Sequence, residues 1–209
     1  MVQKHAQFDN FSEAGLSFGS RDNGSLFFDS NRSTSDTMAW RLTGLLSHDH
    51  EQVEELEDQR GYLATAFRWQ FDDASTLDVL VSYQKDAPLS PPGVPYDLTL
   101  IADPGDVRDL YAGYPNTDDS DRRMLNLGVE YKRELANGWR LEQGFRYQKF
   151  DWDYVGFYAS GLTGDMITIG STYQDETSDT VQADTRLIGE AVTGAATHPL
   201  LFCLEVSRW

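Results

Sequence analysis

Apolar and polar residues alternate with a period of two along most of this chain, and this pattern limits what it can fold into. In segment 76–84 the apolar positions are Leu77, Val79, Val81 and Tyr83. The polar positions between them are Asp78, Ser82 and Gln84. Segments 61–71, 124–134 and 138–150 repeat the alternation. Because successive side chains of a strand point to opposite faces, these segments predict antiparallel strands with one polar face.

Five further segments show a weaker alternation and bring the expected number of strands to nine. They are 8–20, 24–31, 38–47, 178–191 and 199–208. Segment 50–60, "HEQVEELEDQR", contains good helix formers but has no apolar stripe, so we expect an acidic loop there. The sequence therefore predicts an all-β fold without convincing helices.

The connections between these strands alternate between short and long. The segments 72–75 and 136–138 read as tight turns, whereas 48–60, 85–122 and 151–177 read as long loops. This alternation places every long loop at one end of the sheet. Outer-membrane barrels have short periplasmic turns and long extracellular loops, whereas a soluble β-sandwich has no reason for such a bias.

Aromatic and charged residues fit the same interpretation. Trp69 and Phe71 precede one short turn and Trp139 follows another, which predicts an aromatic girdle at a membrane interface. The alternative is the ordinary enrichment of aromatic residues in strands. Charged residues recur on the polar face, at Arg68, Glu130, Lys132, Arg140, Glu142 and Arg146. They would line the lumen of a wide barrel or face solvent in a soluble sheet.

Several functional classes are not expected. The net charge of −17 argues against binding to nucleic acid. The sequence contains no motif for a nucleophilic serine, a zinc protease or a phosphate-binding loop, so we expect no enzyme, no catalytic residue and no cofactor. The lone Cys203 is expected to be a buried thiol.

No metal site is expected either. His48 and His50 form an H-x-H pair that would share one face of a strand, but no third ligand lies at a telling spacing, so we interpret them as loop residues. The acidic stretches "DPGDVRD" and "NTDDSDRR" do not match a calcium-binding loop.

The ordered series of segments resembles TonB-dependent siderophore receptors of the ferrichrome- and pyoverdine-receptor type. The pieces that carry the resemblance are "WRLTGL" (40–45), "FRWQFDDASTL" (67–77), "SYQKD" (82–86), "GVEYKRELANGWRLEQGFRY" (128–147) and "HPLLFCLEVSR" (198–208). No one piece is specific, but their order and spacing match from about residue 8 to the end of the chain.

The resemblance implies an antiparallel transmembrane β-barrel, in this family a 22-stranded barrel filled by an N-terminal plug. It implies a bacterial outer-membrane location and uptake of ferric siderophores. The implied partners are the ferric siderophore, outer-membrane lipid and the TonB-ExbB-ExbD energising complex.

This chain departs from that family pattern. It shows no plug, no TonB box and no signal peptide, and nine strands are an odd number for a bacterial barrel. We therefore expect residues 1–209 to be a partial barrel domain that lacks the plug and the C-terminal strands and is inactive alone. The alternatives are a complete small outer-membrane barrel, porin-like or adhesin, and a soluble β-sandwich binding module.

In the resembling family, long extracellular loops contact the siderophore. The candidate ligand-binding residues are Tyr96, Tyr111, Tyr114, Trp152, Tyr154 and Tyr158. Aromatic rings suit planar hydroxamate and catecholate ligands. The alternative is that the loop tyrosines anchor their own loop, and that the aromatic residues after Asp151 extend a strand above the membrane.

Overall fold

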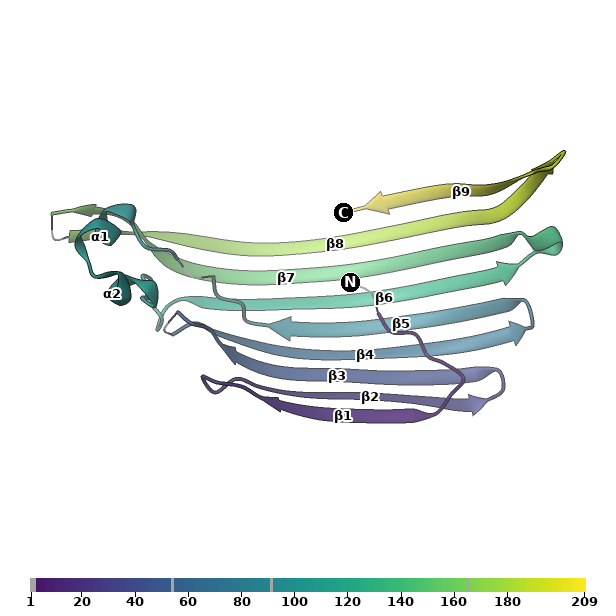
Figure 1. Cartoon of the computed structure of the whole chain (residues 1–209), viewed down its shortest axis with the longest axis horizontal. Helices are drawn as coiled ribbons and strands as arrows, with labels where there is room; N and C mark the ends of the chain where they lie inside the picture. The colour runs from purple at the N-terminus through teal and green to yellow at the C-terminus, as the bar shows by residue number, and fades with distance from the viewer. Residues whose placement is uncertain (1–2, 54, 91, 165) are drawn as a thin grey trace.

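The computed structural model describes residues 3–53, 55–90, 92–164 and 166–209. In these ranges the chain forms nine strands and two short α-helices (Figure 1). The strands are β1 (Phe11–Phe18), β2 (Gly24–Ser35), β3 (Met38–His50), β4 (Glu57–Asp72), β5 (Ser75–Asp86), β6 (Asp119–Glu134), β7 (Arg140–Thr163), β8 (Met166–Thr193) and β9 (Ala196–Arg208). The helices are α1 (Tyr96–Ile101) and α2 (Pro104–Arg108), and one 3-10 turn covers Ala136–Gly138.

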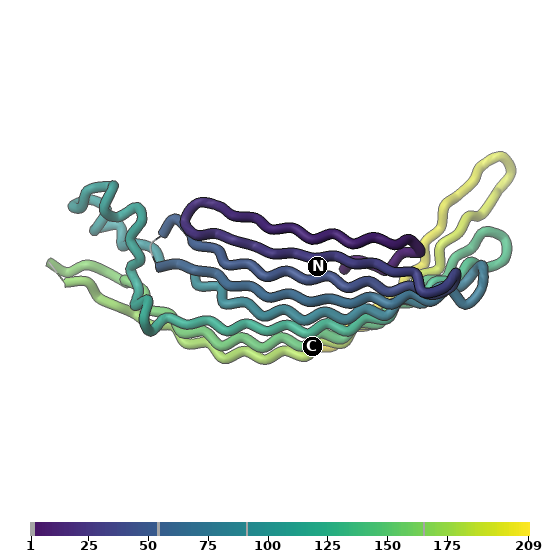
Figure 2. The backbone as a smooth tube through the Cα atoms, turned by 90° about the horizontal axis from the view of Figure 1, so that it is seen from below, coloured from purple at the N-terminus to yellow at the C-terminus, as the bar shows by residue number. Residues whose placement is uncertain are grey.

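The nine strands of the described ranges form one curved sheet in which strand order follows chain order (Figures 1 and 2). Every neighbouring pair is antiparallel. The expected all-β, antiparallel fold is confirmed. Because the described strands belong to one sheet, with no second sheet packed against it, the β-sandwich alternative is wrong.

The pairing registers align the predicted faces from strand to strand. One row across β4, β5, β6 and β7 is Phe67, Val79, Val129 and Phe145. The adjacent row, on the opposite face, is Arg68, Asp78, Glu130 and Gly144. Phe145 is 48% exposed whereas Asp78 is fully buried, so the apolar face is the open one. We call the face of Phe67 and Val79 the outer face and that of Arg68 and Asp78 the inner face.

The segment before β1 crosses the inner face instead of joining the sheet (Figure 1). Asn31 holds it by accepting a hydrogen bond from the Gln7 backbone N–H (2.9 Å) and by donating to the Gln7 carbonyl (2.8 Å). Further along, Gln3 donates to the carbonyls of Thr65 and Val81 at 3.0 and 2.9 Å. The first strand, expected at about residues 8–20, is confirmed but shorter, at Phe11–Phe18, because the residues before it dock on the inner face.

Ion pairs hold the inner face together beneath this segment. Asp29 accepts hydrogen bonds from Arg41 at 2.8 and 2.6 Å and from Lys4 at 2.8 Å. Arg68 donates two hydrogen bonds to Asp78, at 2.7 and 2.9 Å. Arg68, which the sequence alternation places on the polar face, is thus paired with a buried carboxylate, as burial of charged groups requires.

The turns after β2, β4, β6 and β8 lie at one end of the sheet, and the connection of about thirty residues between β5 and β6 lies at the other (Figure 1). All three expected long loops differ from expectation. Of residues 48–60, 48–50 belong to β3 and 57–60 to β4. Residues 151–177 form the far half of the β7–β8 hairpin, which turns near Gly164 (φ 59°). The connection between β5 and β6 contains α1 and α2, which sequence periodicity did not reveal because neither completes two turns.

Aromatic side chains collect on the outer face near the short turns. The rings of Trp69 and Phe71 lie 4.2 Å apart between centroids. Trp139 stacks on Phe202 at 6.3 Å and lies over Gly189, where any side chain would collide with the indole. This placement is the one that the girdle interpretation predicts.

Cys203 is exposed on β9, so the expectation of a buried thiol is wrong. Its side chain lies on a strand whose other edge carries no partner among the described residues. Within the described ranges, none of the helices has the length and apolar character needed to cross a membrane.

Candidate functional site

The loop end of the sheet brings together most of the candidate ligand-binding residues. The β5–β6 connection supplies Tyr96, Tyr111 and Tyr114, and the far half of β7 supplies Trp152, Tyr154 and Tyr158. Within the connection, Asp103 caps α2 by accepting a hydrogen bond from the Gly105 N–H (2.9 Å), and Pro104 occupies the first turn. This is the ordinary chemistry of a helix start.

Asp118 fastens this connection to β7. One carboxylate oxygen accepts hydrogen bonds from the Tyr111 hydroxyl (2.5 Å) and the Tyr114 backbone N–H (3.0 Å). The other accepts one from the Phe157 backbone N–H at 2.9 Å. Gly113 allows this approach, since a Cβ there would collide with Asp118. We call these residues the Asp118 cluster: Tyr111, Gly113, Tyr114, Asp118 and Phe157.

The Tyr111 hydroxyl donates its hydrogen bond to Asp118. Burial raises the pKa of Tyr111 well above its ordinary value, and the Asp118 carboxylate beside it adds to the rise. Tyr111 is therefore neutral at physiological pH, and its hydroxyl proton is donated in a hydrogen bond to the Asp118 carboxylate. The ring of Tyr114 packs edge-to-face on Phe157, with centroids 5.2 Å apart. For Tyr111 and Tyr114 these contacts agree with the alternative that the tyrosines anchor their own loop. Contact of either residue with a ligand stays a prediction.

The aromatic residues of β7 follow each other along its inner face. Trp152 donates its indole N–H to the Ser120 hydroxyl at 3.0 Å, and its ring lies 5.6 Å from that of Tyr154. Tyr158 lies over Gly170 of the paired strand β8. The sequence alternation places Trp152, Tyr154 and Tyr158 on one face, because they are two and four residues apart.

Tyr96 differs from the others because it is the first residue of α1 and is 73% exposed. Its backbone carbonyl accepts a hydrogen bond from the Thr99 hydroxyl at 2.6 Å, which leaves the ring itself unengaged in that contact. The structure thus separates two groups: side chains engaged in building the loop, and the freer rings of Tyr96 and Tyr158. Asp118 was missed in the sequence because it read as one of several solvated acidic residues in "NTDDSDRR".

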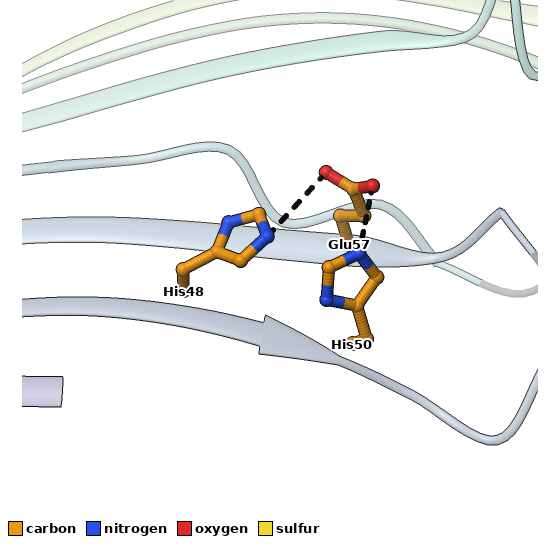
Figure 3. A group of neighbouring side chains, drawn as sticks. All are labelled: His48, His50 and Glu57. Carbon is orange, nitrogen blue, oxygen red and sulfur yellow. Dashed lines mark hydrogen bonds and ion pairs between the residues drawn. The ribbon is translucent and has the colours of Figure 1, made fainter. Parts of the chain in front are cut away.

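A second group of side chains lies at the same end of the sheet. Figure 3 shows His48 and His50 on β3 converging on Glu57 of β4. The register pairs His50 directly with Glu57, so residues seven apart in sequence become neighbours. The expectation that His48 and His50 are loop residues is wrong, since both lie on β3. Their third potential ligand, Glu57, is supplied by strand pairing and not by local spacing.

Comparison with known proteins supports the predicted resemblance. No family model matches the chain. In sequence, it is 22% identical over 217 residues to a ferrioxamine receptor of Yersinia enterocolitica, an alignment that covers the whole chain and 30% of the relative. The chain thus spans about a third of the length of that relative.

Solved structures show the same fold. The chain superposes with a TM-score of 0.90 on the closed form of the ferric-catecholate import receptor Fiu from E. coli K12, at 16% identity, over 99% of this chain and 32% of that one. It superposes with a TM-score of 0.86 on the ferripyoverdine receptor of Pseudomonas aeruginosa, at 16% identity, over 98% of this chain and 28% of that one. The predicted resemblance and barrel fold are confirmed, and the open sheet of this chain corresponds to part of a receptor barrel.

Proposed function

We propose that this chain forms part of the barrel wall and of the ligand-contacting loops of an outer-membrane receptor that imports ferric siderophores. The observation that carries the proposal is the match of the whole sheet to siderophore-receptor barrels, joined by sequence similarity to a ferrioxamine receptor. In this proposal further strands close the barrel and a plug fills it, so that residues 1–209 supply one sector of the wall. Energy for import comes from the TonB-ExbB-ExbD complex.

The two faces of the sheet suit this role. The outer face exposes large apolar side chains, which lipid can cover, and the inner face buries paired charges, which a wet or plugged lumen can accommodate. In this proposal the Asp118 cluster and the extended β7–β8 hairpin lie at the extracellular end, where Asp118 fastens the β5–β6 connection to β7. Aromatic rings at that level supply flat contact surfaces for an iron chelate.

Within this proposal the siderophore contacts the freer rings, Tyr96 and Tyr158, while Tyr111 and Tyr114 position the loop. Trp152 and Tyr154 line the inner face below them. The ligand is a ferric siderophore of hydroxamate or catecholate type, and no resident cofactor or catalytic residue takes part.

Uptake of radiolabelled iron tests the proposal. The full protein is expressed in a host that lacks its own siderophore receptors, and import is measured with a panel of ferric hydroxamates and ferric catecholates. We expect saturable, TonB-dependent import of at least one of them. Passage of small solutes without saturable import would support the porin-like alternative, and cell adhesion without import would support the adhesin.

Two variants and one control locate the ligand contacts. Tyr96→Ala and Tyr158→Ala each remove an aromatic ring, for which we expect a weaker apparent affinity by roughly 5- to 30-fold, the effect of about 1–2 kcal/mol. The control is Tyr173→Ala: this residue is 73% exposed and pairs with Val155 on the opposite face of the same hairpin. Equal effects in all three variants would contradict the assignment.

A further inference from the structure

We propose that His48, His50 and Glu57 bind one divalent transition-metal ion, such as Zn²⁺, and that the ion clamps the end of β3 to the start of β4. Nothing in the proposed transport function requires this site. Two imidazoles and one carboxylate are a common three-ligand set for zinc, with the fourth position left to water. The same donor set also accepts Co²⁺, Ni²⁺ and Cu²⁺.

The backbone positions the three ligands without strain. His48 and His50 are two apart on β3, so both imidazoles project from one face of the strand. Glu57 is the cross-strand partner of His50, and directly paired residues of antiparallel strands also share a face. Three donors are thus gathered by two strands that are fixed by thirteen successive residue pairs.

The side chains already face one another (Figure 3). His50 Nε2 lies 2.9 Å from one carboxylate oxygen of Glu57, and His48 Nε2 lies 3.9 Å from the other. One donor atom from each residue falls within a group no more than 4.8 Å across. Metal–ligand bonds of about 2.1 Å at tetrahedral angles place donors about 3.4 Å apart, between the two observed separations. Small side-chain rotations therefore suffice to close the site.

The ligand atom of His50 already faces the site. Its Nε2 lies 2.9 Å from the Glu57 carboxylate, whereas its Nδ1 is buried and has no hydrogen-bond partner among the described residues. An ion bound at Nε2 replaces the hydrogen bond to Glu57 by shared coordination.

The surrounding charge favours a cation. Glu51 and Glu55 lie in the connection between the two ligand strands, and the whole chain carries a net charge of −17. Such a field raises the local concentration of divalent ions. By contrast, the other group of potential ligands, His5, Asp78 and Glu130, is a poorer site because both oxygens of Asp78 are already bonded to Arg68.

Metal binding by the full protein in detergent micelles tests this inference. The protein carries a purification tag without histidines, and Co²⁺ is titrated while its d–d absorption is recorded, followed by competition with Zn²⁺. We expect one Co²⁺ per chain with the spectrum of a four- or five-coordinate site. His48→Ala, His50→Ala and Glu57→Gln should each weaken binding by more than the roughly 10- to 100-fold typical of second-shell changes. His198→Ala, at the opposite end of the sheet, is the matched control and should bind as the unaltered protein does.

A second readout reports the clamp itself. A protease that cleaves after glutamate can cut at Glu51 and Glu55, in the connection that joins the two ligand strands. We expect Zn²⁺ to slow these cuts in the unaltered protein and not in His50→Ala, with far-UV circular dichroism showing that both are folded. Absence of stoichiometric metal binding, or equal binding by folded variants of all three ligands, would overturn the inference.

Discussion

Replacing Arg68 by methionine is expected to lower the free energy of unfolding by about 3–5 kcal/mol, the cost of leaving a buried charge without its partner. Asp78 is fully buried, and Arg68 donates two hydrogen bonds to its carboxylate. Methionine keeps much of the volume of the arginine side chain but supplies no donor. The measurement is urea unfolding of the full protein in detergent micelles, followed by tryptophan fluorescence.

Two further proteins separate the loss of pairing from other effects. The double variant Arg68→Met with Asp78→Leu removes both charges, and we expect it to be much closer in stability to the unaltered protein. Arg108→Met is the control for an exposed pair, since Arg108 lies 3.9 Å from Asp109 and is largely exposed, and it should change little. A single Arg68 variant as stable as the Arg108 control would show that the inner-face network does not stabilise the sheet.

Placing arginine on the outer face should be similarly damaging. Leu127 lies near the middle of β6, on the outer face, and is 39% exposed. If lipid covers this face, Leu127→Arg costs about 2–4 kcal/mol, as charged residues do at the midplane of outer-membrane barrels. Unfolding in lipid vesicles measures this cost directly.

The neighbouring residue supplies the control. Asn126 lies on the inner face, where it donates a hydrogen bond to the Ser82 hydroxyl at 3.3 Å. Asn126→Arg places the same charge one residue away but toward a polar lumen, so we expect a small effect. Equal destabilisation by the two variants would mean that the faces do not differ in environment.

The strands could be predicted from the sequence because alternation is a local signal. In β4, β5, β6 and β7 large apolar residues recur at every second position over much of each strand, and the registers align these positions from strand to strand. The boundaries were less predictable. Residues 151–177 contain several aspartate and glycine residues that read as a loop, yet backbone pairing with the partner strand sustains the β7–β8 hairpin.

The site was only partly predictable, because most of its contacts join residues that are distant in sequence. Tyr111 and Tyr114 stood out as aromatic residues in a long connection, but their link to Phe157 passes through Asp118, 39 positions before it. Glu57 could not be matched to the histidines until the register of β3 and β4 was known. Likewise, the docking of residues 3–10 depends on Asn31 and Glu130, which no local pattern connects to them.

The central claim is that the outer face of this sheet meets lipid while the inner face lines a lumen. Its most direct test is electron paramagnetic resonance of nitroxide labels at positions 126 and 127 of the full protein in vesicles, with Cys203 replaced by serine. We expect the label at 127 to be reached by oxygen and shielded from a water-soluble nickel complex, and the label at 126 to show the opposite preference. Similar accessibility of both labels to the nickel complex, or exclusion of both reagents from position 127, would contradict the membrane-barrel account.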